Sequence, residues 1–491
     1  MSNHIIGRDE EIKVLQSFLT SKKAEFLAIY GRRRIGKTFL IRQFFQGKNI
    51  AFFNSTGEKD APMKTQIAHF TKQISATFYS GIKLEKCKNW DETFELLTKT
   101  FQTVEKHKKI VLFFDEFPWM AGQNARLLQS LDYYWNHYWS NDPRIKLIIC
   151  GSSASWIIDN IVNNEGGLHN RLTQKIALEP FNLSQTADFL KDKGISLSKK
   201  HIVDLYMCMG GIPYYLSKIE KGISATQIIE SLAFTKQGFL LEEFDNLFSS
   251  LFKNSELYID IIKTIAVHRY GVIQNELLER VGKNLVGKGG VDKLKALKDT
   301  GFIMDFISLF HIEKGRYYKL IDNYSLFYLY WIEPVKNTLL KKSLVNGYWD
   351  KIKTKSEWHS WSGLAFEAIC YEHLPEITKA LELSPTSVPG TWRYVSKKNS
   401  DEKGAQIDLL FDRDDDAITI CEIKYSDKPF VITKEYAMKL EQKLEIFKKI
   451  TRTSKQLFLV FISANGIKSN QYSEKLVTKV ITIDDLFQKI K

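Results

Sequence analysis

Short apolar runs alternate with helical patterns over the first 181 residues of the chain. Uninterrupted apolar runs of this kind are typical of strands that are buried on both faces, as in parallel sheets. The pattern therefore predicts a five-stranded parallel sheet covered by helices. The five runs are FLAIY, NIAFFN, IVLFFDE, RIKLIICGSS and QKIALEPF, at residues 26–30, 49–54, 110–116, 144–153 and 174–181.

Helical periodicity replaces this alternation in the middle of the chain. Residues 183–252 have the pattern of amphipathic helices, and three further helical runs lie between residues 255 and 301. Two strand-like runs, GFIMDFISLFHI and RYYKLIDNY, follow them. Three helices and a hairpin resemble a winged helix, which is a module that can read DNA.

The third helical run leaves two interpretations of this module open. One face carries lysines that suit DNA, and the opposite face is expected to pack into the core. Winged helices inside switch ATPases also pack against other domains without touching DNA, and the pattern favours neither reading. The lysines are Lys293, Lys295 and Lys298, and the core positions are Val291, Leu294 and Leu297.

The C-terminal part of the chain mixes strands and helices. Residues 405–426, AQIDLLFDRDDDAITICEIKYS, have the pattern of two strands around an acidic turn. A helical run precedes them at 361–374, another follows at 433–449, and a further apolar strand is expected at 456–463. This order predicts a separate α/β domain.

Composition narrows the class of protein. The chain has 491 residues, which indicates three or four domains, and its 44% hydrophobic content is ordinary for a soluble protein. No apolar stretch reaches the ~18 residues that span a membrane. The start, MSNHIIGRDE, lacks the pattern of a secretory signal, and the five scattered cysteines form no CxxC pair. These features predict a cytoplasmic protein without a disulfide framework.

The charge balance suggests a polyanionic partner. Seventy basic and 57 acidic residues leave a formal net charge of +13. Such an excess suits nucleic acid, although many equally basic proteins bind none. Nucleic acid binding is therefore a hypothesis that needs a binding site to support it.

The segment GRRRIGKT, residues 31–38, is the clearest chemical signal in the chain. It follows an apolar strand and precedes a helical run, which is the context of a phosphate-binding P-loop. Gly31 and Gly36 allow backbone N–H groups to surround phosphate oxygens. Lys37 would reach the terminal phosphates of ATP, and Thr38 would supply a hydroxyl to Mg²⁺.

Two acids end the third strand run and fit the same chemistry. Asp115 is placed to hold Mg²⁺ through water, and Glu116 to polarise the water that attacks the γ-phosphate. At the end of the fourth run, Ser152 or Ser153 is a candidate to touch the γ-phosphate or that water. A turn made of small residues is an alternative there.

These motifs resemble the archaeal-type P-loop ATPases of the STAND branch, which are related to AAA+ proteins. IIGRDEE, residues 5–11, matches the family's leading motif, and the resemblance implies a place beside the adenine base. Arg171 matches the arginine that senses the γ-phosphate, in cis or in trans. Gly211, Ile212 and Pro213 match the family's GxP motif in a helical lid, although a simple helix break is the alternative. Many AAA+ motors carry a second sensor arginine after that motif; its absence here favours a switch over a ring motor.

The ICEIKYS stretch carries a second candidate site. Side chains alternate along a strand, so Glu422 and Lys424 share a face. The acidic turn allows a hairpin that places Asp408 beside them. Two carboxylates can hold Mg²⁺ or Mn²⁺, and a lysine can orient the metal-bound water.

This arrangement resembles the PD-(D/E)xK nuclease-like superfamily. Glu367, on the preceding helical run, matches the upstream acid and metal ligand of that family. Gln406 and Ile407 stand before Asp408, where the family's name expects a proline. The resemblance implies a nuclease-like domain, and it leaves open whether the site cleaves nucleic acid or only binds it.

The predicted fold class is α/β and multidomain. A P-loop ATPase domain with a parallel sheet is expected first, then a helical lid, a winged helix and a restriction-endonuclease-like domain. Their expected ranges are 1–182, 183–252, 253–345 and 355–491.

The leading functional hypothesis is an ATP-binding and ATP-hydrolysing switch that controls a metal-dependent nuclease-like domain. The alternative is a regulatory ATPase whose last domains bind DNA or a protein without cutting. Small-molecule kinase activity is disfavoured, because Asp115 and Glu116 together fit water activation better. A homo-oligomer is required if Arg171 acts in trans.

Overall fold

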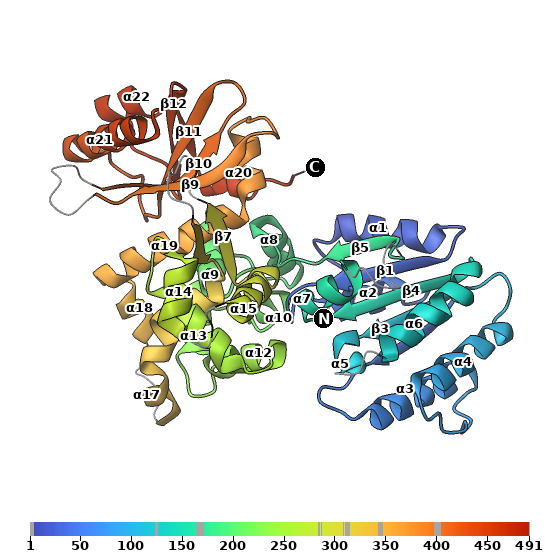
Figure 1. Ribbon diagram of the computed structural model, residues 1–491. Coiled ribbons are helices and arrows are strands. Elements are labelled where there is room, and N and C mark those ends of the chain that lie inside the picture. Colours follow the sequence, from blue (N-terminus) through green and yellow to red (C-terminus); the bar gives the residue numbers. More distant parts are fainter. Residues whose placement is uncertain are drawn as a thin grey trace. The chain divides into compact units, whose positions relative to one another are not determined.

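A computed structural model describes most of the chain. The described residues are 4–122, 126–163, 171–282, 285, 287–307, 309, 315–341, 347–396 and 404–490. The chain divides into two compact units, Met1–Pro180 and Phe181–Lys491. Figure 1 shows the elements of each unit. In the described part of the chain, no helix is long and apolar enough to cross a membrane.

The first unit is built on a parallel sheet with the strand order β2-β3-β4-β1-β5. The expected five-stranded parallel sheet is confirmed. Its strands are β1 (Glu25–Tyr30), β2 (Ile50–Thr56), β3 (Lys109–Asp115), β4 (Ile145–Gly151) and β5 (Gln174–Ala177). The longer helices are α1 (Asp9–Thr20), α2 (Lys37–Phe45), α3 (Met63–Phe78), α4 (Trp90–Thr100) and α6 (Arg126–His137), and the shorter ones are α5 (Phe117–Ala121) and α7 (Ala154–Ile157).

An aromatic core fixes the central strands of this unit. Every residue of β4 is buried, as are six of the seven residues of β3. The Phe114 ring lies 5.4 Å from Phe70 of α3, and Trp139 lies 5.3 Å from Phe94 of α4. Parallel strands bring their carboxyl ends to one edge of the sheet. The loops after β1, β3 and β4, which carry the expected nucleotide residues, therefore meet at that edge.

The second unit begins with helices. Capping boxes start α8 at Asn182 and α11 at Ser224, so the backbone N–H groups of these first turns have side-chain partners. The helices are α8 (Leu183–Asp192), α9 (Lys199–Met209), α10 (Pro213–Leu216), α11 (Ala225–Ala233) and α12 (Phe239–Leu251).

Three helices and a small antiparallel sheet of order β6-β8-β7 follow. One expectation for the third helix is wrong: Val291 is 40% exposed instead of buried in the core. The buried stripe runs through Gly290, Leu294 and Leu297, and Val291 lies one residue off that stripe. The elements are α13 (Ser255–Ala266), β6 (Val272–Ile273), α14 (Gln274–Val281), α15 (Lys288–Asp299), β7 (Ile303–Ile307) and β8 (Arg316–Leu320).

Short helical segments then lead to a five-stranded mixed sheet of order β13-β12-β11-β10-β9. Strands β9, β10 and β11 are antiparallel, whereas β11, β12 and β13 are parallel. The helices before the sheet are α16 (Asn323–Phe327), α17 (Lys336–Lys341), α18 (Tyr348–Ile352), α19 (Ser356–Glu372) and α20 (Leu374–Ala380). Residues 342–346, at the expected end of the winged-helix domain, lie outside the described residues.

An apolar core joins one face of this sheet to the long helix α21. The Phe447 ring of α21 lies 5.0 Å from Trp392 of β9, and Figure 1 shows α21 running beside the strands. The expected α/β character of the C-terminal part is confirmed. Its elements are β9 (Val388–Tyr394), β10 (Ala405–Asp412), β11 (Ala417–Lys424), α21 (Lys434–Thr451), β12 (Gln456–Ser463), α22 (Gln471–Leu476), β13 (Lys479–Ile481) and α23 (Ile483–Leu486).

Candidate nucleotide and carboxylate–lysine sites

The glycines of the 31–38 loop have different reasons to be glycine. Gly31 has a φ of +142°, and a Cβ there would lie 2.2 Å from the carbonyl oxygen of Leu178. Gly36 has a φ of +94° immediately before α2, and an added Cβ would meet nothing within 4 Å. The loop backbone therefore packs closely against Leu178 at Gly31, whereas nothing packs against it at Gly36. This leaves the backbone at the start of α2 accessible to an anion.

Lys37 is folded back onto this loop. Its Nζ donates hydrogen bonds to the carbonyl oxygens of Gly31 at 2.7 Å and Arg32 at 2.8 Å. The side chain is buried, and this burial lowers the pKa of Lys37. The hydrogen bonds of this buried ammonium go to neutral carbonyls, although the carboxylates of Glu116 and Asp115 also favour its charge. An anionic group in place of the carbonyls would give it stronger, charge-assisted hydrogen bonds, so the loop fits a phosphate group.

Thr38 and Asp115 lie together, although 77 positions separate them in the chain. The Thr38 hydroxyl donates to Asp115 Oδ2 at 2.9 Å. Asp115 is buried at the end of β3. A hydroxyl beside a carboxylate is the donor set that Mg²⁺ prefers, so these residues fit the metal that accompanies ATP.

Glu116 is held in an uncommon backbone conformation, with φ 46° and ψ 44°. Its Oε2 accepts hydrogen bonds from the Ser152 backbone N–H at 3.1 Å and from the Ser152 hydroxyl at 2.8 Å. Of the two serines singled out in the sequence, Ser152 is thus the one in contact with Glu116. A left-handed non-glycine residue costs roughly 1 kcal/mol, and such strain clusters at functional positions.

The leading motif reaches the loop through Arg8. Its guanidinium donates to the carbonyl oxygens of Ile35 at 3.2 Å and Glu179 at 2.8 Å. Burial lowers the pKa of Arg8 to about 10, while Glu11 opposes that shift. Arg8 therefore ties the N-terminal segment to the P-loop and to the segment after β5.

The two remaining nucleotide candidates lie on different units. Arg171 is exposed, three residues before β5 begins. Pro213 is the first residue of α10 in the second unit, and its fixed φ suits that position. Gly211 is required by space, because a Cβ there would lie 1.7 Å from the Phe181 carbonyl oxygen.

The β10–β11 hairpin brings two of the C-terminal acids together. Leu409 pairs with Cys421, so Asp408 and Glu422 are the next residues on the paired strands. Lys424 Nζ lies 2.8 Å from Glu422 Oε1. Gln406, two residues before Asp408, donates to Asp408 Oδ1 at 2.8 Å.

Glu367 of α19 is held by a residue that the sequence reading missed. Lys319 of β8 donates to Glu367 Oε2 at 2.7 Å, and Lys319 is buried. The Tyr371 hydroxyl, 3.4 Å from Lys319 Nζ, donates to the backbone oxygen of Asp408 at 2.7 Å. Asp408 and Glu367 are therefore linked through β8, an element that precedes the last domain in the sequence.

Helix α21 supplies two further residues that were missed. Lys443 donates to Glu422 Oε2 at 2.6 Å, and the Tyr436 hydroxyl donates to Glu422 Oε1. The signal for Lys443 was present in the sequence: it lies three residues after Leu440 and four before Phe447, on the buried stripe of α21. A lysine at a core position of an amphipathic helix indicates a buried acidic partner.

We refer to this set as the carboxylate–lysine cluster: Glu367, Asp408, Glu422, Lys319, Lys424 and Lys443. Within the described ranges, no group of three or more His, Cys, Asp or Glu side chains is gathered closely enough to hold a metal ion. Lysines accompany the acids, with Lys319 on Glu367 and two lysines on Glu422. The donor set suits a divalent cation chemically, but such an ion competes with ammonium groups already in place.

The cluster separates the pKa values of its acids. Burial, followed by the carboxylates of Glu367 and Glu422, raises the pKa of Asp408 to about 7. Burial opposes ionisation of Glu422 as well, but Lys443 and Lys424 hold its pKa at about 2. Neighbouring carboxyls pushed in opposite directions are typical of functional sites.

We expect Asp408→Asn to become progressively more stabilising, relative to the unchanged chain, as pH rises from about 4 to about 7. In this interval Asp408 is ionised in the unfolded state and protonated in the folded state. The folded state therefore binds more protons, and ionising Asp408 costs stability with rising pH. Urea unfolding of both proteins between pH 5 and 8 measures the effect. A stability difference that does not change with pH would contradict it.

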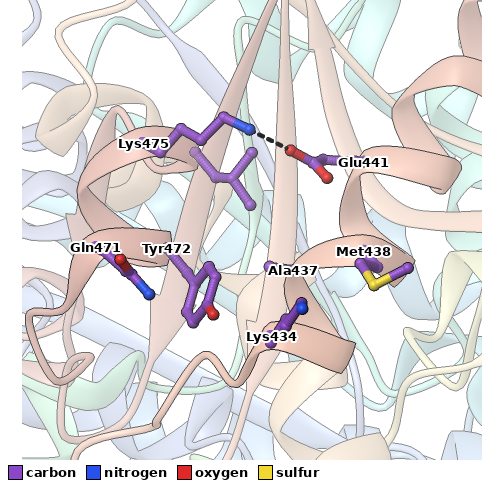
Figure 2. Close-up of a pocket in the computed structure, with 8 residues that line it drawn as sticks. Lys434, Ala437, Met438, Glu441, Gln471, Tyr472 and Lys475 are labelled. Atoms are coloured by element: carbon purple, nitrogen blue, oxygen red, sulfur yellow. Dashed lines mark hydrogen bonds and ion pairs between the residues drawn. The ribbon is translucent and has the colours of Figure 1, made fainter.

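The other side of α21 borders a separate groove of about 280 Å³. Figure 2 shows Lys434, Met438 and Glu441 of α21 facing Tyr472 and Lys475 of α22. Lys475 donates to Glu441 at 2.9 Å across the groove. Because Tyr436 and Lys443 contact Glu422 instead, the groove is distinct from the carboxylate–lysine cluster.

Two family models match parts of the chain. Residues 5–219 match a family described as an ATPase domain predominantly from Archaea. Residues 328–440 match a family of archaeal and bacterial proteins of unknown function. The first match includes the P-loop and the Asp115–Glu116 pair, and the second includes Glu367, Asp408 and Lys424.

Individual proteins also match. An uncharacterized protein from Methanocaldococcus jannaschii is 26% identical over 432 residues, which cover 86% of this chain and 88% of that protein. An uncharacterized ATP-binding protein from the same organism is 42% identical over 45 residues, covering 9% of this chain and 76% of that protein. The Walker-type ATPase of Pyrococcus abyssi superposes with a TM-score of 0.45 and 18% identity, covering 66% of this chain and 96% of that one.

Proposed function

We propose that the chain is a switch driven by ATP binding and hydrolysis, and the match of residues 5–219 to the predominantly archaeal ATPase domain family supports this proposal. The observation that carries the proposal is the contact of Thr38 with Asp115 at 2.9 Å, directly beside Glu116. It brings the expected magnesium residues and the expected water-activating residue to one edge of the sheet.

In this mechanism, Lys37 and Glu116 each give up a hydrogen bond that they make in the nucleotide-free protein. Lys37 leaves the loop carbonyls and donates to phosphate oxygens. Thr38 and Asp115 would hold Mg²⁺, which would offset the negative charge of the phosphates. Glu116 leaves Ser152 and accepts a proton from the attacking water. Arg171 acts as the sensor of the γ-phosphate, and the GxP segment with Pro213 acts as part of the responding lid.

We expect Thr38→Ala to lower phosphate release from ATP by at least ~10-fold and to raise the Mg²⁺ concentration needed for half-maximal rate. The substitution removes the hydroxyl that Asp115 contacts but leaves Lys37 in the loop. A coupled phosphate-release assay over a Mg²⁺ series measures both effects, and Thr38→Ser, which keeps the hydroxyl, is the matched control. An unchanged Mg²⁺ dependence in Thr38→Ala would remove the assigned role.

We propose metal-dependent cleavage of nucleic acid as the function of the C-terminal part. The raised pKa of Asp408, about 7, favours this candidate because the cluster holds a carboxyl that a cation would help to ionise. Asp408, Glu422 and Glu367 are the proposed metal ligands. The described structure does not gather the three acids closely enough to hold a metal ion, so binding would require them to draw together and Lys319 and Lys443 to release Glu367 and Glu422. Lys424 is the proposed residue that orients water. The net charge of +13 suits a nucleic acid substrate.

The competing interpretation is a regulatory ATPase whose last part binds DNA or a protein without cutting. The lysines of the cluster favour it, since they already balance Glu367 and Glu422. The arrangement of α13–α15 with the β6-β8-β7 sheet supports a winged helix. One of its expected DNA contacts is already in an ion pair, because Lys298 lies 2.5 Å from Asp305.

We expect the full chain to nick or linearise plasmid DNA with Mg²⁺ or Mn²⁺ and ATP, and Asp408→Ala and Lys424→Ala to lose this activity by at least ~100-fold. The matched control is Lys455→Ala, because Lys455 pairs with Asp412 on the same sheet outside the cluster. Gel electrophoresis with each metal and nucleotide measures the outcome. Intact DNA under all conditions would favour the regulatory interpretation.

A further inference from the structure

A buried charged group joins helix α9 to the end of β11. Asp204, in the middle of α9, is 1% exposed. Its Oδ1 accepts a hydrogen bond from the Tyr425 hydroxyl at 2.6 Å, and its Oδ2 lies 3.3 Å from Lys353. A buried carboxylate persists only with such partners, so this junction strongly specifies how α9 and β11 are placed.

Tyr425 lies next to two of the segments that form the carboxylate–lysine cluster, β11 and α19. It follows Lys424 directly in the chain, and its ring lies 5.3 Å from the ring of Phe366. Phe366 immediately precedes Glu367 on α19. A displacement of Tyr425 therefore acts next to Lys424 on one side and next to Glu367 on the other.

The C-terminal half of α9 is also fixed to the point where the second unit begins. Phe181 is the first residue after the ATPase unit, and its N–H donates to the Gly211 carbonyl at 2.7 Å. Its carbonyl accepts from the Tyr206 hydroxyl at 2.9 Å. Tyr206 lies on α9, two residues after Asp204, so α9 is held at the GxP segment and at β11 at once.

We infer that Asp204 and Tyr425 are positioning residues that transmit the nucleotide state to the carboxylate–lysine cluster. ATP binding changes the conformation at β5, and Phe181 transmits this change to α9. The Asp204–Tyr425 hydrogen bond then transmits it from α9 to β11. This inference rests on the proposed ATP switch, but it does not require that the cluster cleave anything.

A second link between α9 and the C-terminal part provides a matched control. Lys199, at the start of α9, lies 2.6 Å from Asp484 of α23, and both side chains are exposed. Exposed ion pairs contribute little, roughly 0–1 kcal/mol. Lys199→Met therefore removes a link of similar span without disturbing the buried junction.

The test is hydrogen–deuterium exchange of the full chain with Mg²⁺ and adenylyl imidodiphosphate, a non-hydrolysable ATP analogue. We expect the analogue to change the exchange rate of residues 425–432, which follow β11, by at least about fivefold. Tyr425→Phe, which keeps the ring against Phe366, should lose this response while binding the analogue with unchanged affinity. Lys199→Met should keep it.

A second substitution distinguishes loss of the Asp204–Tyr425 coupling from a general loss of folded structure. Asp204→Ala should lose the same response, and the double variant should lose no more than either single variant. Circular dichroism melting establishes that each variant is folded. A Tyr425→Phe protein that keeps the full response overturns the inference. An unchanged protein that binds the analogue without any response at 425–432 also overturns it, whereas failure to bind the analogue at all refutes the proposed switch instead.

Discussion

Glu116→Gln is expected to lower the rate of ATP hydrolysis by ~100-fold or more while leaving ATP affinity within a few-fold of the unchanged chain. Glutamine has the same shape and can still accept hydrogen bonds from Ser152 through its amide oxygen. It cannot take a proton from water, so the chemical step is lost and binding remains. Single-turnover hydrolysis and equilibrium binding of ATP, measured on the same protein, separate the two effects.

Ser152→Ala provides the companion measurement. It removes the hydroxyl that lies 2.8 Å from Glu116 Oε2 but leaves the carboxylate. We therefore expect a smaller change in hydrolysis than for Glu116→Gln. Equal rates for Glu116→Gln and the unchanged protein would show that another group activates the water.

Gly211→Ala is expected to destabilise the second unit by ~3 kcal/mol or more, the upper range for an overpacked site. The new Cβ would lie 1.7 Å from the Phe181 carbonyl oxygen and 2.6 Å from its carbon. This backbone cannot easily retreat, because Phe181 already bonds Gly211 and Tyr206. Urea unfolding followed by circular dichroism measures the loss.

The adjacent glycine is the matched control for that substitution. Gly210 has a φ of +62° but open space where a Cβ would stand. Its ψ of −171° lies in a region that is essentially restricted to glycine, so Gly210→Ala incurs the backbone penalty alone, roughly 1–3 kcal/mol. If Gly211→Ala were no more destabilising than Gly210→Ala, the close approach of Phe181 and Gly211 would not be a constraint on the fold.

The parallel sheet was predictable because its strands are buried on both faces. Such strands appear in the sequence as continuous apolar runs, and the chemistry follows at their carboxyl ends in Gly31–Thr38 and Asp115. The hairpin was predictable for a similar local reason. The acidic turn between two strand patterns brings β10 and β11 together, and strand alternation then places Lys424 beside Glu422.

The members of the carboxylate–lysine cluster that could not be predicted from the sequence are brought there by contacts between distant segments. Lys319 and Glu367 are separated by 48 positions, and the local sequence of β8 says nothing about α19. Asp204 and Tyr425 are 221 positions apart. Such pairs follow from how whole elements pack, and hydrophobic periodicity does not encode that packing. Lys443 is the exception, because its place on an apolar stripe marks it as unusual.

Val291 shows the limit of periodicity within a single helix. Leu294 and Leu297 of α15 are buried as expected, but at the start of the helix Gly290 rather than Val291 is the buried position. A glycine contributes little to a hydrophobic pattern, so the pattern could not mark it as the buried position.

The measurement that tests the central claim most directly is a calorimetric titration of the nucleotide-free full chain with Mg²⁺–ATP, next to Lys37→Ala. The account predicts saturable binding by the unchanged protein and a loss of affinity of at least ~100-fold in Lys37→Ala, because the buried ammonium is the charged partner of the phosphates. Equal affinity of the two proteins for ATP would contradict the proposed nucleotide site, and with it the switch that depends on it.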